Sequence, residues 1–176
     1  LQAVTCPIQQ GLVDDNPDVD AIFRLTLPLP FRFAAADSVA LGAGSVCPFN
    51  SQNTTWFRDA FPLLYLPSHC SFRMTDIWRS FIAQRIAWNC GWSVLFHAST
   101  ARQERNDHRL LKDFEDEIPG YLQNAAIVRM LAALDLRDGP ENLLDNLERC
   151  YVALVRGGFI GEAELPLVRA WSRELS

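Results

Sequence analysis

The sequence lacks the features of membrane-spanning, secreted and nucleic-acid-binding chains. Its 176 residues contain no run of about 20 apolar residues, the length that crosses a bilayer. The opening residues, LQAVTCPIQQ, have neither the basic start nor the apolar stretch of a signal peptide. Basic residues are scattered, and the formal net charge is −5. We therefore expect no membrane span in this chain and no nucleic-acid partner.

The cysteines lack the spacing of metal-binding or redox motifs. The five of them include no CxxC pair, so a zinc ribbon or a thioredoxin motif has no support. A cysteine hydrolase that pairs Cys47 or Cys70 with a histidine has only its residue types in its favour. We keep this reading as a minor alternative.

The composition is that of a globular chain with one main core, because 49% of the residues are hydrophobic and 21% are charged. The first residue is not methionine. We therefore expect a processed product or one piece of a longer protein.

The first hundred residues mix short strand and helix patterns. Apolar runs predict strands over Leu1–Cys6 and Ala21–Leu27, with a polar turn at residues 14–18 between them. A short helix interrupted by Pro62 is expected over Trp56–Tyr65, and a buried strand over residues 93–98. These patterns favour an α/β fold.

The last seventy residues read as helices. Helical spacing of apolar residues appears over residues 107–117 and 121–136, and a further helix starts near Pro140 and continues to Val155. A final short helix is expected over Leu165–Leu175.

The stretch RMTDIWRSFIAQRIAW, residues 73–88, contains most of a predicted helix over Ile77–Asn89 that packs on several sides. Its apolar residues cover most of the circumference. Asp76 has the residue type of an N-cap, and Gly91 stands where a helix-ending glycine is common. An ordinary N-cap is therefore one reading of Asp76.

Three motifs in a fixed order give a second reading. RMTDIWRSFIAQRIAW, together with PFNSQNTTWF before it and RNDH after the next strand, resembles the STELLO family of glycosyltransferases. GLVDDNPDVDA and the turn CPFN are similar, more distantly, to the reversibly glycosylated polypeptides, or UDP-arabinopyranose mutases. The resemblance is seen over about residues 10–117 and not beyond.

The resemblance implies the carboxyl-terminal part of a GT-A-like (Rossmann-like) nucleotide-sugar fold in residues 1–110, followed by a helical extension in residues 111–176. The expected activity is metal-dependent transfer from a nucleotide sugar to a glycan or protein acceptor. This chain would supply the acceptor side, and an upstream half would bind the nucleotide. A eukaryotic member would work in the Golgi lumen, and any other in the cytoplasm.

The resemblance also implies roles at the start of the 73–88 helix. Asp76 would act as the general base, because a carboxylate there stays ionised and fixed in direction. Arg73, Trp78 and Arg79 lie at the same end and would contact the substrate.

The RNDH stretch would complete the donor side. His108 would coordinate a divalent metal, Mn²⁺ or Mg²⁺, and Arg105 would contact a phosphate. The alternative is a solvated polar segment that precedes a surface helix.

The polar run NSQNTTW would contact sugar hydroxyls, because a side-chain amide both donates and accepts hydrogen bonds. Asn50, Gln52 and Asn53 are the candidates. A turn whose side chains satisfy their own backbone is the alternative.

One departure from the family pattern concerns the acidic D-x-D motif that holds the metal. Asp18-Val19-Asp20 matches it literally but falls in a turn after Asn16-Pro17, so we read it as structural. The metal and nucleotide half would then be missing from this chain. The second functional class is a non-catalytic protein-interaction module derived from a glycosyltransferase fold, which the acidic helices from Leu110 to Ser176 suit. An exposed apolar stripe on residues 141–155 would favour it.

Overall fold

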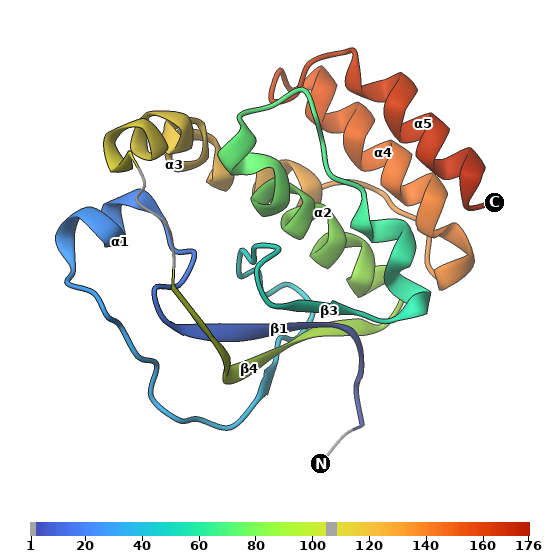
Figure 1. Cartoon of the computed structure of the whole chain (residues 1–176). Coiled ribbons are helices and arrows are strands. Elements are labelled where there is room, and N and C mark those ends of the chain that lie inside the picture. Colours follow the sequence, from blue (N-terminus) through green and yellow to red (C-terminus); the bar gives the residue numbers. More distant parts are fainter. Residues whose placement is uncertain (1–2, 105–108) are drawn as a thin grey trace.

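A four-stranded mixed sheet forms the base of the molecule in the computed structural model, which describes residues 3–104 and 109–176 (Figure 1). The strands are β1 (Thr5–Asp15), β2 (Val39–Ala40), β3 (Thr54–Trp56) and β4 (Trp92–Gln103), in the order β2-β4-β1-β3. The two long strands, β1 and β4, are parallel, whereas β2 and β3 are antiparallel edges. A parallel pair requires a crossover, which here contains α2 (Thr75–Asn89).

The remaining elements are helical. The other α-helices are α1 (Ala21–Thr26), α3 (Leu110–Ala132), α4 (Leu143–Arg156) and α5 (Glu164–Glu174). Short 3-10 helices cover η1 (Arg58–Leu64), η2 (Phe72–Met74) and η3 (Pro140–Asn142). The described elements therefore form an α/β fold, which confirms the predicted class at that level.

Helix α2 is the centre of the core. It lies between the sheet and α4, and α5 covers the far side of α4 (Figure 1). Trp78, Ile82 and Ile86 of α2 are each at most 1% exposed, as expected for a helix that is apolar on most sides. One core cluster runs from Ile8 in β1 to Val168 in α5. The proposed division at residue 110 stays a prediction, and a single core spans both sides of it.

The prediction of a strand over Ala21–Leu27 was wrong. This segment is the helix α1, which starts where the Asp20 carboxylate accepts a hydrogen bond from Phe23 N at 3.1 Å. The strand predicted over Leu1–Cys6 overlaps β1 only at Thr5 and Cys6. Strand β1 starts at Thr5. It continues to Asp15, through residues predicted as a turn, because β4 pairs with it as far as Gln103.

Two helix boundaries differ from the prediction. Helix α2 ends at Asn89, before Gly91 with φ +67°, as predicted, but it starts at Thr75. Asp76 is therefore a first-turn residue and not the N-cap. The segments at 107–117 and 121–136 are one helix, α3, that starts at Leu110, ends at Ala132 and contains Pro119 in its interior.

None of the helices in residues 3–104 and 109–176 combines the length and the hydropathy of a membrane span.

The shared core makes a testable prediction about α4. Leu154 is fully buried, so Leu154→Ala leaves a cavity and should lower the free energy of unfolding by about 2–5 kcal/mol, measured by urea denaturation. Hydrogen exchange of β4 amides should accelerate together with that of α5 amides. The control Leu167→Ala, at a site that is 42% exposed on α5, should change stability by less than about 1 kcal/mol. Loss of protection in α4 and α5 alone would contradict a shared core.

Candidate functional site

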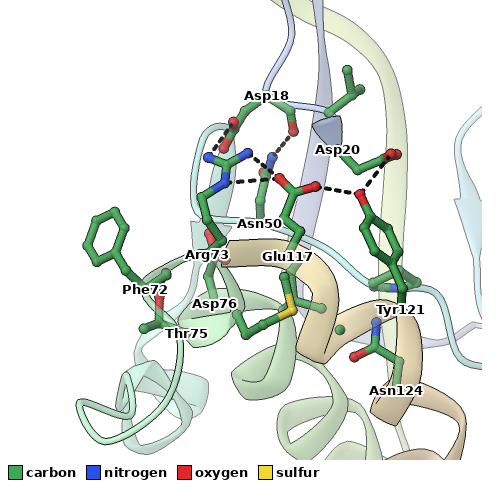
Figure 2. A pocket seen from close by; sticks show the side chains of 15 residues that line it. Asp18, Asp20, Asn50, Phe72, Arg73, Thr75, Asp76, Glu117, Tyr121 and Asn124 are labelled. Carbon is green, nitrogen blue, oxygen red and sulfur yellow. Dashed lines mark hydrogen bonds and ion pairs between the residues drawn. The ribbon is translucent and has the colours of Figure 1, made fainter. Parts of the chain in front are cut away.

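A cavity of about 480 Å³ opens where the start of α2, the middle of α3 and the loop after β1 meet (Figure 2). This size falls in the range of small-molecule sites. Three of the predicted site residues, Asn50, Arg73 and Asp76, line it. The full lining is Asp18, Val19, Asp20, Pro48, Asn50, Phe72, Arg73, Met74, Thr75, Asp76, Ile77, Glu117, Gly120, Tyr121 and Asn124.

A buried ion pair forms one wall of the cavity. Glu117 of α3 is 3% exposed, and its Oε1 accepts from Arg73 Nε at 3.0 Å and from Arg73 Nη2 at 2.7 Å. The other oxygen, Oε2, accepts from the backbone N of Ala21 at 2.7 Å and from the Tyr121 hydroxyl at 2.5 Å. One carboxylate thereby joins η2, α3 and α1.

Arg73 also faces Asp18, with 3.6 Å between Nη1 and Oδ1. Burial by itself would lower the pKa of Arg73, but the hydrogen bond to Glu117 and the charges of Asp18 and Glu117 outweigh burial and raise it. Burial, together with the Glu117 carboxylate, raises the pKa of Tyr121. The guanidinium therefore stays charged, and the phenol stays protonated and donates to Glu117.

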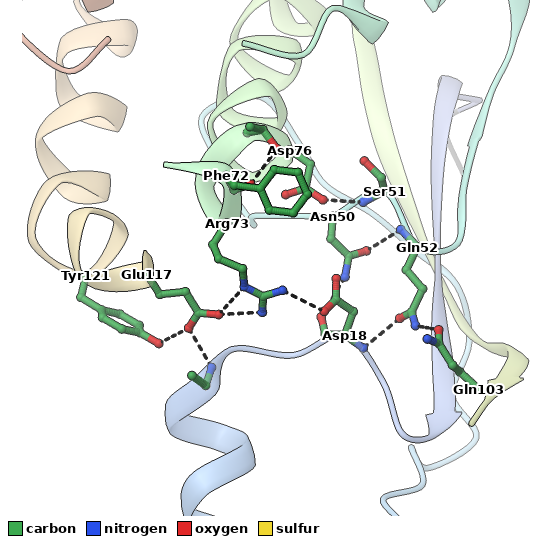
Figure 3. Close-up of polar contacts among 12 residues, drawn as sticks. Asp18, Asn50, Ser51, Gln52, Phe72, Arg73, Asp76, Gln103, Glu117 and Tyr121 are labelled. Atoms are coloured by element: carbon green, nitrogen blue, oxygen red, sulfur yellow. Dashed lines mark hydrogen bonds and ion pairs between the residues drawn. The ribbon is translucent and has the colours of Figure 1, made fainter. Parts of the chain in front are cut away.

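The loop that carries Asp18 is held by two of the predicted sugar-binding amides (Figure 3). Asn50 Nδ2 donates to the carbonyl of Asp18 at 2.8 Å, and the backbone N of Asp18 donates to Gln52 Oε1 at 2.9 Å. Asn50 Oδ1 also accepts from the backbone N of Gln52 at 3.1 Å. This bond is the Asx-turn contact of the alternative reading, so the geometry favours a structural role for both amides.

Asn53 lies away from the cavity, on the sheet. Its Nδ2 donates to the carbonyl of Leu12 at 3.0 Å and to Thr100 Oγ1 at 2.8 Å. A Cβ at Gly11 would come within 2.4 Å of this amide nitrogen, so only glycine leaves room for it in β1.

Asp76 is half-buried and lines the cavity from the first turn of α2. Its Oδ2 accepts from the backbone N of Ser51 at 3.0 Å. The positive end of the helix stabilises a negative charge at this position. The carboxylate is therefore held in one direction while facing a space that a ligand can fill.

The other two predicted contacts from α2 point into the protein. The Trp78 ring is 1% exposed, and its Nε1 donates to Asn124 Oδ1 at 2.9 Å. The Arg79 guanidinium is 5.0 Å from the centre of the Trp56 ring and donates to Ser51 Oγ at 3.1 Å. Burial lowers the pKa of Arg79, although the charge of Asp76 acts in the opposite direction. Trp78 thus supports the cavity residue Asn124 directly, and Arg79 contacts Ser51, whose amide binds Asp76.

The predicted metal and phosphate contacts, His108 and Arg105, lie outside the described residues. Within the described ranges, no group of three or more His, Cys, Asp or Glu side chains is arranged to hold a metal ion. Asp18 pairs with Arg73, and Asp20 caps α1, so both acids of the D-x-D sequence contact the protein itself.

The thiols of the hydrolase alternative are poorly suited to attack. Burial raises the pKa of Cys47, and burial with the charge of Glu164 raises the pKa of Cys70 to about 12. Both thiols donate to proline carbonyls, those of Pro48 and Pro67. A protonated thiol is a weak nucleophile, so this alternative is not supported.

Comparison with known proteins shows the family. The family model of STELLO glycosyltransferases matches residues 73–176, more than half of the chain. The chain belongs to the STELLO family. Two relatives from Arabidopsis thaliana, Probable glycosyltransferase STELLO2 and Probable glycosyltransferase STELLO1, are 28% and 29% identical to it over 174 residues. These alignments cover 96% of this chain and 22% of each relative, so the chain spans about a fifth of their length.

The STELLO match corrects the predicted extent of the resemblance. It was expected over residues 10–117, but the family model runs to Ser176 and the alignments cover nearly the whole chain. Helices α3, α4 and α5 therefore belong to the STELLO region and share the core of the α/β part.

Most of the cavity lining was not identified from the sequence, including Phe72, Glu117, Tyr121 and Asn124. Glu117 and Tyr121 are four residues apart, a spacing that places them on one helix face. The same spacing is common on solvated helices, and the partners of Glu117 lie 44 and 96 residues away along the chain. No local pattern marks these residues.

The Glu117 carboxylate makes a testable prediction. Glu117→Ala removes the acceptor that Arg73, Tyr121 and the Ala21 amide share, so it should lower the free energy of unfolding by about 3–5 kcal/mol in urea denaturation. Hydrogen exchange at Ala21 should accelerate. Glu115→Ala is the matched control, because that side chain is 69% exposed in a surface ion pair, and it should cost less than about 1 kcal/mol. Equal costs for the two variants would contradict the role assigned to Glu117.

Proposed function

We propose that this chain forms the acceptor side of a glycosyltransferase site in which Asp76 is the general base. The observation that carries the proposal is the position of Asp76, held by the Ser51 amide on the wall of the cavity. Membership of a family described as glycosyltransferases supports it.

The proposed chemistry is an inverting transfer. The acceptor hydroxyl oxygen attacks the anomeric carbon of the donor sugar, the bond to the nucleoside diphosphate breaks, and the hydroxyl proton passes to the Asp76 carboxylate. Asp76 would act mainly through its position. The bond from Ser51 provides that position, since it fixes one carboxylate oxygen.

The proposal also includes a separate half of the site that binds the nucleotide-sugar donor. The four-stranded α/β sheet is compatible with the carboxyl-terminal part of a GT-A-like fold. The nucleotide-binding half would come from a segment outside these 176 residues, in keeping with the 22% share of the relatives that the chain spans.

The second functional class, an interaction module, lacks the observation that would favour it. The apolar residues of α4 face the core, and Leu147, Tyr151 and Leu154 are at most 1% exposed. None of the exposed large apolar side chains lies in residues 141–155. The catalytic reading is therefore preferred.

Asp76→Asn tests the central role. The amide keeps the size of the side chain and can still accept from Ser51, but it cannot take a proton. Turnover in a sugar-nucleotide assay of the whole protein should fall by roughly 10²–10⁴-fold, with the midpoint of thermal unfolding nearly unchanged. Asp59→Asn is the control, because Asp59 is an exposed acid in the first turn of η1 and does not line the cavity. Wild-type turnover of Asp76→Asn would rule out the proposed base.

Metal dependence is tested separately at His108. If this imidazole completes the coordination of a divalent ion, His108→Ala should shift the Mn²⁺ concentration for half-maximal turnover upward by about 10-fold or more. His97→Ala is the control, because His97 contacts Gln9 and Ser38 on the sheet. If the Mn²⁺ titration of His108→Ala is unchanged, His108 is not a metal ligand, and the alternative of a solvated polar segment is supported.

A further inference from the structure

Phe72 is an exposed aromatic residue at the edge of the cavity. Its side chain is 85% exposed, more than any other large apolar residue that the structure describes. It precedes Arg73 in η2, and Figure 2 shows its ring beside Thr75, clear of the Arg73 and Glu117 pair. A phenylalanine in this position presents a flat apolar face to anything that enters the cavity.

Polar groups on other parts of the cavity wall are held in fixed directions (Figure 2). Asp76 is fixed by Ser51, Asn124 by the Trp78 indole, and Asp18 by Arg73. The Asp76 carboxylate and the Asn124 amide have more hydrogen-bonding capacity than these contacts use. A cavity that holds both an apolar ring and oriented polar groups matches a sugar, which has hydroxyls at its edge and C–H groups on its faces.

The charge of the cavity restricts the ligand further. Among the described residues that line it, Asp18, Asp20, Asp76 and Glu117 are acidic and Arg73 is basic, so these side chains carry a formal charge of −3. Arg73 is already engaged by Glu117 and Asp18. A diphosphate or a carboxylate would be repelled here, whereas a neutral hydroxylated ligand meets no such penalty.

We propose that this cavity binds a neutral glycoside as the acceptor, with the pyranose ring packed on Phe72, and that the nucleoside diphosphate binds elsewhere. The inference rests on the proposed function in reading the bound glycoside as an acceptor. Phe72 is then a residue that determines acceptor specificity, and Asp76 lies within the same cavity as the hydroxyl it would deprotonate.

The test is a binding titration that needs no turnover. The ¹H–¹⁵N spectrum of the chain is recorded with methyl glycosides of glucose, galactose, mannose and xylose, and the amides of Asp76, Tyr121 and Asn124 are followed. At least one neutral glycoside should shift these amides saturably. The matched uronic acid glycoside, with a carboxylate at C6, should bind at least about 5-fold more weakly because of the acidic lining.

Variants at Phe72 test whether the sugar ring packs on this side chain. Phe72→Ala should weaken binding of that glycoside by about 5-fold or more, and Phe72→Trp should restore it to within about 2-fold. Phe61→Ala is the matched control, because Phe61 is 44% exposed on η1 and does not line the cavity. Saturable shifts that are unchanged in Phe72→Ala would overturn the proposal, and so would the absence of binding by every neutral glycoside or shifts of the same amides by a nucleoside diphosphate.

The two proposals fail in different ways. If glycoside binding depends on Phe72 but the whole protein transfers no sugar, the proposed glycosyltransferase function is wrong and the proposed glycoside site is supported. If transfer depends on Asp76 but the acceptor is not a carbohydrate, the proposed glycoside site is wrong and the role of Asp76 as general base is supported. In an active protein, Phe72→Ala should raise the KM for the acceptor and leave the KM for the donor unchanged.

Discussion

The carboxylate of Glu117 is the contact on which the cavity depends. It accepts hydrogen bonds from Arg73, from Tyr121 and from the first amide of α1, so it joins three segments that are distant in sequence. A buried carboxylate without these partners would be costly, so each partner must be in place when the chain folds. The Arg73 guanidinium that binds Glu117 also pairs with Asp18, so Glu117 indirectly fixes the position of the loop that carries Asp18.

Helix α2 connects this site to the core. Its body packs against the sheet and α4, and Trp78 and Arg79 of this body also contact residues at or next to the cavity. Trp78 orients Asn124, and Arg79 contacts Ser51, whose backbone amide binds Asp76. A rigid helix with a buried body gives the carboxylate at its first turn a fixed position, as the proposed general base requires.

Much of the helical architecture could be predicted from the sequence. Helices α2, α4 and α5 were predicted near their observed positions, and Gly91 marked the end of α2. The strand near residues 93–98 was also found, though β4 is longer. Helix α1 was missed because its six residues have no helical period, and its start depends on Asp20 and on a bond from Ala21 to Glu117. Strand length was missed because it depends on pairing between β1 and β4, distant in sequence.

The candidate site was predicted only in part. Asp76 and Arg73 line the cavity, as their place at the start of α2 suggested, whereas Trp78 is buried within the core. The amides of Asn50 and Gln52 bind the Asp18 loop, a contact that no local pattern distinguishes from a ligand contact. Residues whose role depends on a distant partner, with Glu117 the main example, needed the structure.

The most direct test of the account is a crystal structure of the whole protein with a nucleoside diphosphate and a bound neutral glycoside. The account predicts a sugar ring packed on Phe72, a hydroxyl within about 3 Å of the Asp76 carboxylate, and the diphosphate outside this cavity. A diphosphate in the cavity, or a sugar bound elsewhere with Asp76 facing solvent, would contradict it.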